Sequence, residues 1–131
     1  MNRSRNNIAL MSLLIPLLLF QAGCVYLVVG SLGAVGGYVV SPDTVEGVTS
    51  YDKNQIWDAA VEVLSIMGLI EEQSEAGGMI IAKVHGAKVT VTIFEINQDT
   101  TKLSVKSRKA FLPKISVAQD VYVKIINYLE G

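Results

Sequence analysis

Residues 87–108 read AKVTVTIFEINQDTTKLSVKSR and contain two alternating segments on either side of a turn. In the first segment, residues 88–96, the apolar Val89, Val91 and Ile93 alternate with Thr90 and Thr92, which is the two-residue period of a β-strand. In the second segment, residues 102–108, Leu103 and Val105 hold the apolar positions. The Asn-Gln-Asp-Thr sequence between the segments is typical of a turn. The stretch therefore predicts an antiparallel hairpin with one apolar and one polar face.

Three further strands are expected before this hairpin, over residues 45–50, 69–74 and 79–84. The last two are separated by the turn pair Gly77-Gly78. A two-residue gap, His85-Gly86, then leads into the hairpin. Gaps this short join neighbouring antiparallel strands, so the four consecutive strands should form a meander.

Two amphipathic helices flank these strands. The first should begin after Asp52, a good N-cap, with Gln55 completing a capping box, and should stop at Gly68. The second begins where Ser116 and Gln119 suggest another capping box and runs nearly to the C-terminus. Apolar residues recur at helical spacing in both.

The predicted fold class follows from this order of elements. The sequence indicates an α+β domain over residues 43–131 with the order β-α-β-β-β-β-α. Two amphipathic helices need one common surface to cover, so we expect a two-layer sandwich with both helices on one face of an antiparallel sheet.

Composition excludes several classes of function. The chain has 131 residues and a formal net charge of −1, which gives no general attraction to nucleic acid. A single Cys and a single His, His85, cannot build a Cys-rich or His-rich metal site, and no nucleotide-binding glycine motif is present. We therefore expect no catalytic residues, no metal, no cofactor and no nucleic-acid partner.

The first 23 residues have the order of a secretory signal peptide. Arg3 and Arg5 precede a largely apolar run over residues 8–20, and Ala22 and Gly23 follow. A run of thirteen residues is short for a membrane span, which needs roughly 20.

The position of Cys24 makes the signal more specific. Ala22-Gly23-Cys24 directly after the apolar run resembles the lipobox of bacterial lipoproteins. That resemblance implies acylation of Cys24 and cleavage between Gly23 and Cys24. It further implies outer-membrane rather than inner-membrane retention, because Val25 stands where an Asp would favour the inner membrane. Gln21 departs from the usual Leu of the motif.

Residues 24–42 would form a membrane-proximal segment between this Cys and the domain. Four glycines interrupt its apolar run, and Gly33 and Gly37 form a small-xxx-small pair suited to close helix contact in lipid. One interpretation is a helix in or on the bilayer, and the other is an irregular linker. An uncleaved anchor that oligomerises through Gly33 and Gly37 is thus the alternative to a lipoprotein.

One surface of the predicted sheet could bind a partner. The strand alternation places basic side chains on the face opposite the core. These are Lys83, Lys88, Lys102, Lys106 and Arg108. Such a face could meet lipid headgroups or an anionic envelope polymer, although antiparallel sheets often leave one face simply solvated.

Apolar residues could extend onto that same face. Met79, Ile81, Phe94 and Ile96 could mark an interface with an envelope protein. We expect instead that they pack beneath the loop of residues 109–114.

The helix and strand residues resemble a family of small bacterial lipoproteins classed as domain of unknown function 3568. The resemblance covers about residues 24–129 and includes the glycine-rich segment. The residues that carry it are Tyr51-Asp52, Ile56-Trp57-Asp58-Ala59, Leu64, Met67-Gly68-Leu69, the run Ala87-Lys88-Val89-Thr90-Val91 and the strand Thr101–Val105. It implies no catalytic residues.

These observations favour a non-enzymatic lipoprotein of the bacterial cell envelope, acylated at Cys24, with the domain facing the periplasm. It would bind or organise envelope components. A third interpretation, a small-ligand-binding module, requires a concave pocket between helices and sheet.

Overall fold

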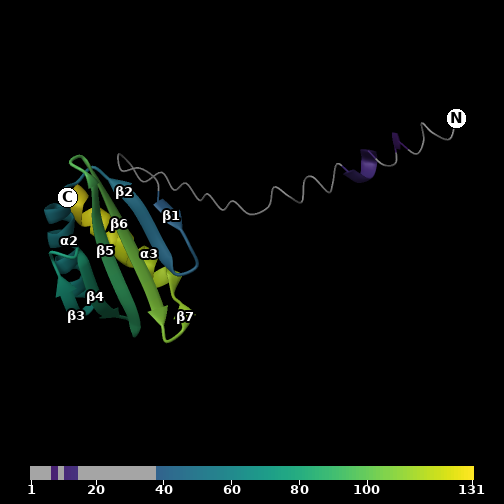
Figure 1. The fold of residues 1–131 in the computed structure, drawn as a ribbon. Coiled ribbons are helices and arrows are strands. Elements are labelled where there is room, and N and C mark those ends of the chain that lie inside the picture. Colours follow the sequence, from purple (N-terminus) through teal and green to yellow (C-terminus); the bar gives the residue numbers. More distant parts are fainter. Residues whose placement is uncertain (1–6, 9–10, 15–37) are drawn as a thin grey trace.

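The computed structural model describes residues 7–8, 11–14 and 38–131 (Figure 1). The predicted cleavage site at Gly23 and Cys24, and the glycine pair Gly33 and Gly37, lie outside the described residues. Within the described part of the chain, no helix combines the length and the apolar character needed to cross a membrane.

The sheet contains seven strands, all in antiparallel pairs, in the spatial order β1-β2-β6-β5-β4-β3, with β7 paired to the end of β6. Two helices, α2 and α3, complete the domain. The elements in chain order are β1 (Tyr38–Val40), β2 (Thr44–Thr49), α2 (Lys53–Met67), β3 (Gly68–Ser74), β4 (Met79–Val84), β5 (Ala87–Asn97), β6 (Thr100–Lys109), β7 (Leu112–Pro113) and α3 (Ile115–Glu130).

The two-layer α+β sandwich expected from the sequence is confirmed. Both helices cover the same face of the sheet, with α3 over β2 and β6 and α2 over β3, β4 and β5 (Figure 1). We call the helix-covered side the inner face and the opposite side the outer face. The four consecutive strands β3 to β6 form the expected meander, and β2 joins it beside β6.

Two short strands were not expected. β1 consists of the last residues of the apolar segment, which the sequence assigned to a membrane helix or an irregular linker. Tyr38 and Val40 pack against the core, and β1 pairs with β2 in the register Val40↔Val45. The folded domain therefore includes Tyr38–Val40, which precede the boundary expected at residue 43. The loop expected over residues 110–114 likewise contains β7.

The capping box of α2 is present as predicted. The Asp52 side chain accepts hydrogen bonds from the backbone N–H groups of Asn54 at 2.8 Å and Gln55 at 3.0 Å, and Gln55 Oε1 accepts one from the Asp52 N–H. These bonds satisfy donors that a helix start leaves open. Gly68 ends the helix, but its φ of −170° is extended and open to any residue.

The requirement for glycine at position 68 is therefore one of space. A Cβ on Gly68 would collide with the backbone carbonyl oxygen of Lys83 on the neighbouring strand β4. The close approach lets α2 pass directly into β3 without a connecting residue.

The capping box predicted for the second helix is wrong. α3 begins two residues earlier than expected, with Lys114 and not Ser116 at the N-cap and no side-chain hydrogen bond to the helix start. Ser116 consequently lies inside the first turn. The apolar stripe is nevertheless correct, since Val121, Tyr122 and Ile125 are buried against the sheet.

The core fills the space between the helices and the inner face. Its side chains alternate with more exposed ones along β2, β4, β5 and β6, and those of Val89, Val91, Leu103 and Val105 are fully buried. Trp57 is also buried, as a core residue of α2. This packing occupies the region where a ligand pocket between helices and sheet would have to lie.

Tyr122 connects α3 to the first two strands. Its ring lies 5.4 Å from that of Tyr38 on β1, and a Cβ on Gly47 of β2 would collide with its hydroxyl oxygen. Burial raises the pKa of Tyr122 to about 12.

Candidate functional site

All five predicted basic residues lie on the outer face of the sheet. Lys83 is on β4, Lys88 on β5, and Lys102, Lys106 and Arg108 on β6. Each alternates along its strand with buried core residues, so its side chain points away from the helices. The two-residue period of the strands is therefore sufficient to place these cations.

Three of these cations stand in one row across the sheet. The strand register pairs Lys83 with Lys88, and Lys88 with Arg108, on three adjacent strands. We call these three residues the cationic row. Directly opposed like charges on neighbouring strands repel each other and cost stability. The row is thus an unfavourable arrangement for the fold by itself.

A hollow of about 540 Å³ lies over this part of the outer face. The cationic row lines it together with Lys106, Thr90, and the turn residues Gly86 and Ala110. The hollow is shallow and open, so it fits a surface with protruding groups rather than an enclosed small molecule.

Lys102 does not belong to this cluster. It lies nearer the other end of β6, where it borders a second hollow of about 320 Å³ together with Phe94, Glu46, Thr92 and Ser104. Its Nζ is 3.0 Å from a carboxylate oxygen of Glu46. Four of the five predicted residues therefore form one group, and the fifth, Lys102, is separate from them in an ion pair with Glu46.

Asp43 partly neutralises the group of four. Arg108 Nε donates a hydrogen bond of 2.6 Å to Asp43 Oδ2, and Lys106 Nζ lies 3.8 Å from the same oxygen. The Arg108 hydrogen bond lowers the pKa of Asp43, assisted by a hydrogen bond from Thr44. Among the ion pairs of the described residues, none involves Lys83 or Lys88.

The expectation that Phe94 and Ile96 pack beneath the loop at residues 109–114 is wrong. Phe94 is opposite Lys102, whereas that loop follows Arg108 at the other end of β6. The Phe94 and Ile96 side chains are 63% and 50% exposed. Met79 and Ile81, by contrast, are partly buried on β4.

Sequence reasoning missed the most exposed aromatic residue of the domain. Phe111 is 91% exposed, and Leu112 beside it is 67% exposed. They lie where β6 turns back into β7, with Lys109 paired to Leu112. The signal was present in the sequence as Lys-Ala-Phe-Leu-Pro-Lys over residues 109–114, an apolar pair between two lysines.

The remaining candidate residue of the described chain is its single histidine. His85 is exposed in the tight turn between β4 and β5, where it and Gly86 both have positive φ values, 50° and 77°. The described residues contain no group of three or more His, Cys, Asp or Glu that could hold a metal ion.

A scan against models of protein families and a search of curated proteins each found no match to this chain. Membership of the family classed as domain of unknown function 3568 therefore remains a prediction from the residues quoted above.

Proposed function

We propose that this protein is a non-enzymatic lipoprotein of the bacterial cell envelope, anchored through an acylated Cys24, and that its folded domain binds anionic envelope components through its outer face. The observation that carries the anchor is the order of the first 24 residues: two arginines, an apolar run and Ala22-Gly23-Cys24. A permanent anchor needs two or more acyl chains, which this class of modification supplies.

The folded domain is consistent with a short tether. Its first strand begins at Tyr38, fourteen residues after Cys24. Fourteen residues reach at most about 50 Å when fully extended. A domain held within this distance of a bilayer would spend its time among headgroups and the polymers next to them.

The outer face supplies the binding surface in this proposal. It gathers Lys83, Lys88, Lys106 and Arg108 around one hollow, although residues 25–131 carry more acidic than basic groups. Cations collected on one side of an acidic domain give a directional attraction to anionic surfaces.

The anchor is tested by measuring the intact mass of the protein extracted from membranes, beside a Cys24→Ala variant. The expected mass is that of residues 24–131 plus acyl chains, with the variant neither acylated nor cleaved. A full-length, unmodified mass for the parent chain would overturn the lipoprotein. It would favour the uncleaved anchor and make association through Gly33 and Gly37 the next question.

Localisation provides a second test. With Val25 after the Cys, the acylated protein should fractionate with the outer membrane. Changing Val25→Asp should move it to the inner membrane, while Val25→Ala, the matched control, should leave it in place. An identical distribution of both variants would contradict the proposed sorting.

A further inference from the structure

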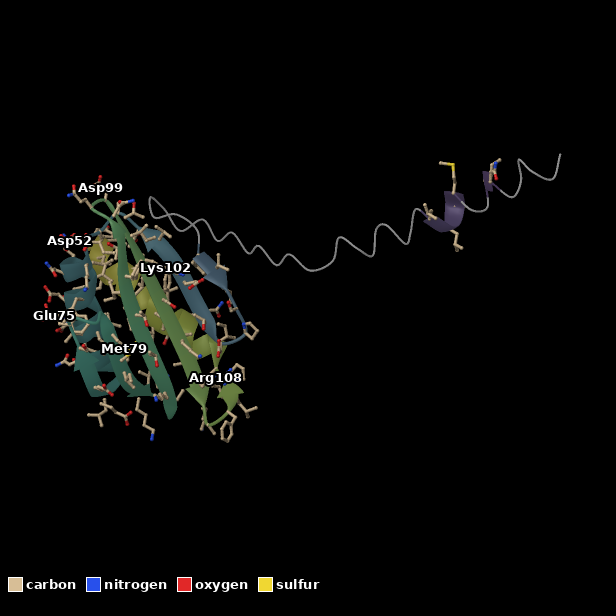
Figure 2. The ribbon with its side chains drawn as sticks, viewed as in Figure 1. Asp52, Glu75, Met79, Asp99, Lys102 and Arg108 are labelled. Atoms are coloured by element: carbon tan, nitrogen blue, oxygen red, sulfur yellow. The ribbon has the colours of Figure 1, made fainter. Side chains whose placement is uncertain are left out.

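The two ends of the domain differ in charge and in apolar exposure. We call the end of the sheet that carries the His85-Gly86 turn and the Ala110-Phe111 turn the basal end, and the end that carries Asp99 the distal end. Figure 2 shows Arg108 toward the basal end, whereas Asp52 and Asp99 lie together at the other.

Cations gather at the basal end. Six of the nine lysines and arginines after Cys24 lie in residues 83–88 and 106–114, and these two segments contain no carboxylate. Asp99 and Asp52 lie toward the distal end (Figure 2), and Glu95 is paired with Thr101 next to the same turn as Asp99. The domain is therefore an electric dipole whose positive end is basal, and a negatively charged surface would orient it with that end inward.

Exposed apolar side chains flank the cationic row on both sides. In the strand register, Leu69 on β3 is paired with Lys83, and Pro113 on β7 is paired with Arg108. Leu69 is 67% exposed, and Ile66 at the end of α2 is 76% exposed. On the other side, Phe111 lies in the turn before β7 and Leu112 is the first residue of that strand.

The geometry points to docking of the basal end on an anionic lipid bilayer, with Phe111 and Leu112 inserted at the level of the headgroups and the cationic row bound to headgroup phosphates. This assignment rests on the proposed function for the anionic class of the partner and names the partner as lipid. A soluble anionic polymer would attract the cations but would leave Phe111 and Leu112 in water. Apolar side chains beside lysines are the combination that a bilayer interface accommodates.

The tether is long enough for this orientation. β1 runs antiparallel to β2, so the chain enters β1 from the distal side and continues toward the basal end. β5, with eleven residues, is about 36 Å long. The fourteen residues from Cys24 to Tyr38 reach about 46–50 Å and can therefore pass the length of the sheet to the same bilayer.

The local carboxylates do not cancel the effect. Asp43 binds Arg108 and lies near Lys106, and Glu72 is paired with Ile81 on the edge strand. Lys83 and Lys88 have no carboxylate partner among the ion pairs of the described residues. Their charge is available to a headgroup.

The test uses the full protein reconstituted in vesicles, with a polarity-sensitive dye on one introduced thiol. Leu112→Cys reports on the basal end, and Asp99→Cys is the matched control at the distal end. Each of these two substitutions is made twice, once in the parent chain and once in the Cys24→Ala variant. Either the acyl chains or the uncleaved leader would hold the domain on the vesicle, so the readout does not depend on which anchor is correct. Intact mass shows separately whether Cys24 is acylated.

If the basal end docks, the emission of the dye at position 112 should shift to the blue and should be quenched by brominated lipid. Both changes should occur in vesicles that contain phosphatidylglycerol and not in vesicles of pure phosphatidylcholine. Position 99 should show neither change. Lys88→Glu changes the charge by two units and should lower the docking equilibrium constant by about 25-fold, since each unit of charge near an anionic surface contributes roughly fivefold. Lys124→Glu, on the exposed side of α3, is the charge-matched control and should have no effect.

Three outcomes would overturn the inference. An aqueous signal at position 112 in both vesicle types would exclude insertion, whether or not Cys24 proves to be acylated. Equal insertion in pure phosphatidylcholine would remove the role of the cationic row. A dye response to soluble polyphosphate, without a response to anionic vesicles, would assign the surface to a polymer.

Discussion

The inner and outer faces of the sheet are built from the same strands by the same alternation, yet they behave differently. On the inner face, Val89, Val91 and Val105 are fully buried beneath two helices. On the outer face, Lys88 lies opposite Lys83 on one neighbouring strand and opposite Arg108 on the other. Contacts on the inner face stabilise the fold, whereas the repulsion among the three cations on the outer face destabilises it. A surface that costs stability is a better candidate for function than one that is merely polar.

The largest effect should come from the inner face. Leu64→Ala removes a fully buried side chain of α2 and should lower the free energy of unfolding by about 2–5 kcal/mol. Leu69→Ala, on the exposed side of β3, is the matched control and should change stability by less than about 0.5 kcal/mol. Urea denaturation measures both. Equal losses for the two leucines would remove the contrast between the faces.

The second-largest effect should be a loss of stability at alkaline pH, caused by the buried Tyr122. An unfolded tyrosine ionises near pH 10, whereas the pKa of Tyr122 in the fold is raised to about 12. The stability that this difference contributes is complete below pH 10 and is lost as pH rises toward 12, by about 2–3 kcal/mol. Tyr122→Phe should flatten that decline, and the exposed Tyr128→Phe should not. Parallel curves for the two variants would contradict the prediction.

A somewhat smaller loss of stability is expected from a substitution at the junction between α2 and β3. Gly68→Ala places a methyl group against the Lys83 carbonyl and should destabilise the fold by about 1–3 kcal/mol, despite the smaller entropy of the unfolded alanine chain. Gly77→Ala meets only the Ser74 hydroxyl, a movable side-chain group, and should be tolerated. Thermal unfolding of the pair separates a steric requirement from a general preference for glycine.

A gain in stability is expected on the outer face. Lys88→Gln relieves repulsion with Lys83 and Arg108 and should stabilise the fold by about 0.2–1 kcal/mol at low salt. Lys102→Gln instead breaks the pair with Glu46 and should be neutral or slightly destabilising. A loss of stability in Lys88→Gln would show that the cationic row is no strain on the sheet.

The smallest expected effect is a loss of stability at acidic pH. Hydrogen bonding to Arg108 lowers the folded pKa of Asp43, so its contribution to stability is present above the unfolded pKa, near 4, and disappears as pH falls through the folded value. Asp43→Asn should remove this acid dependence together with the small stability that the Asp43–Arg108 pair contributes at neutral pH. Denaturation midpoints between pH 2 and pH 6 provide the measurement, and an unchanged acid slope would exclude the effect.

The fold was predictable where side-chain period alone decides structure. Alternation over residues 88–96 and 102–108 identified the hairpin and assigned Val91 and Lys88 to opposite faces. The capping box at Asp52 located α2. These signals are local, because each depends on residues within a few positions of one another.

The errors arose where tertiary contacts decide. β1 is apolar and glycine-rich in sequence, and only pairing with β2 and packing of Tyr38 on Tyr122 make it a strand. Strand register, which no local pattern determines, separated Lys102 from the other cations and placed Phe94 far from the loop at residues 109–114. The exposure of Phe111 follows from the β6–β7 turn, which also depends on pairing across the sheet.

The edge strand β3 affects how the sheets of neighbouring copies of this chain can meet. A bulge interrupts its pairing between Ile70 and Glu72, and exposed Glu71 and Glu72 follow one another along it. Exposed strand edges are the sites at which sheets from different molecules join, and bulges and charges at an edge prevent this. Copies anchored in the way proposed above would share a two-dimensional surface, where encounters are frequent. The irregular, acidic edge would keep these neighbours from polymerising into a continuous sheet.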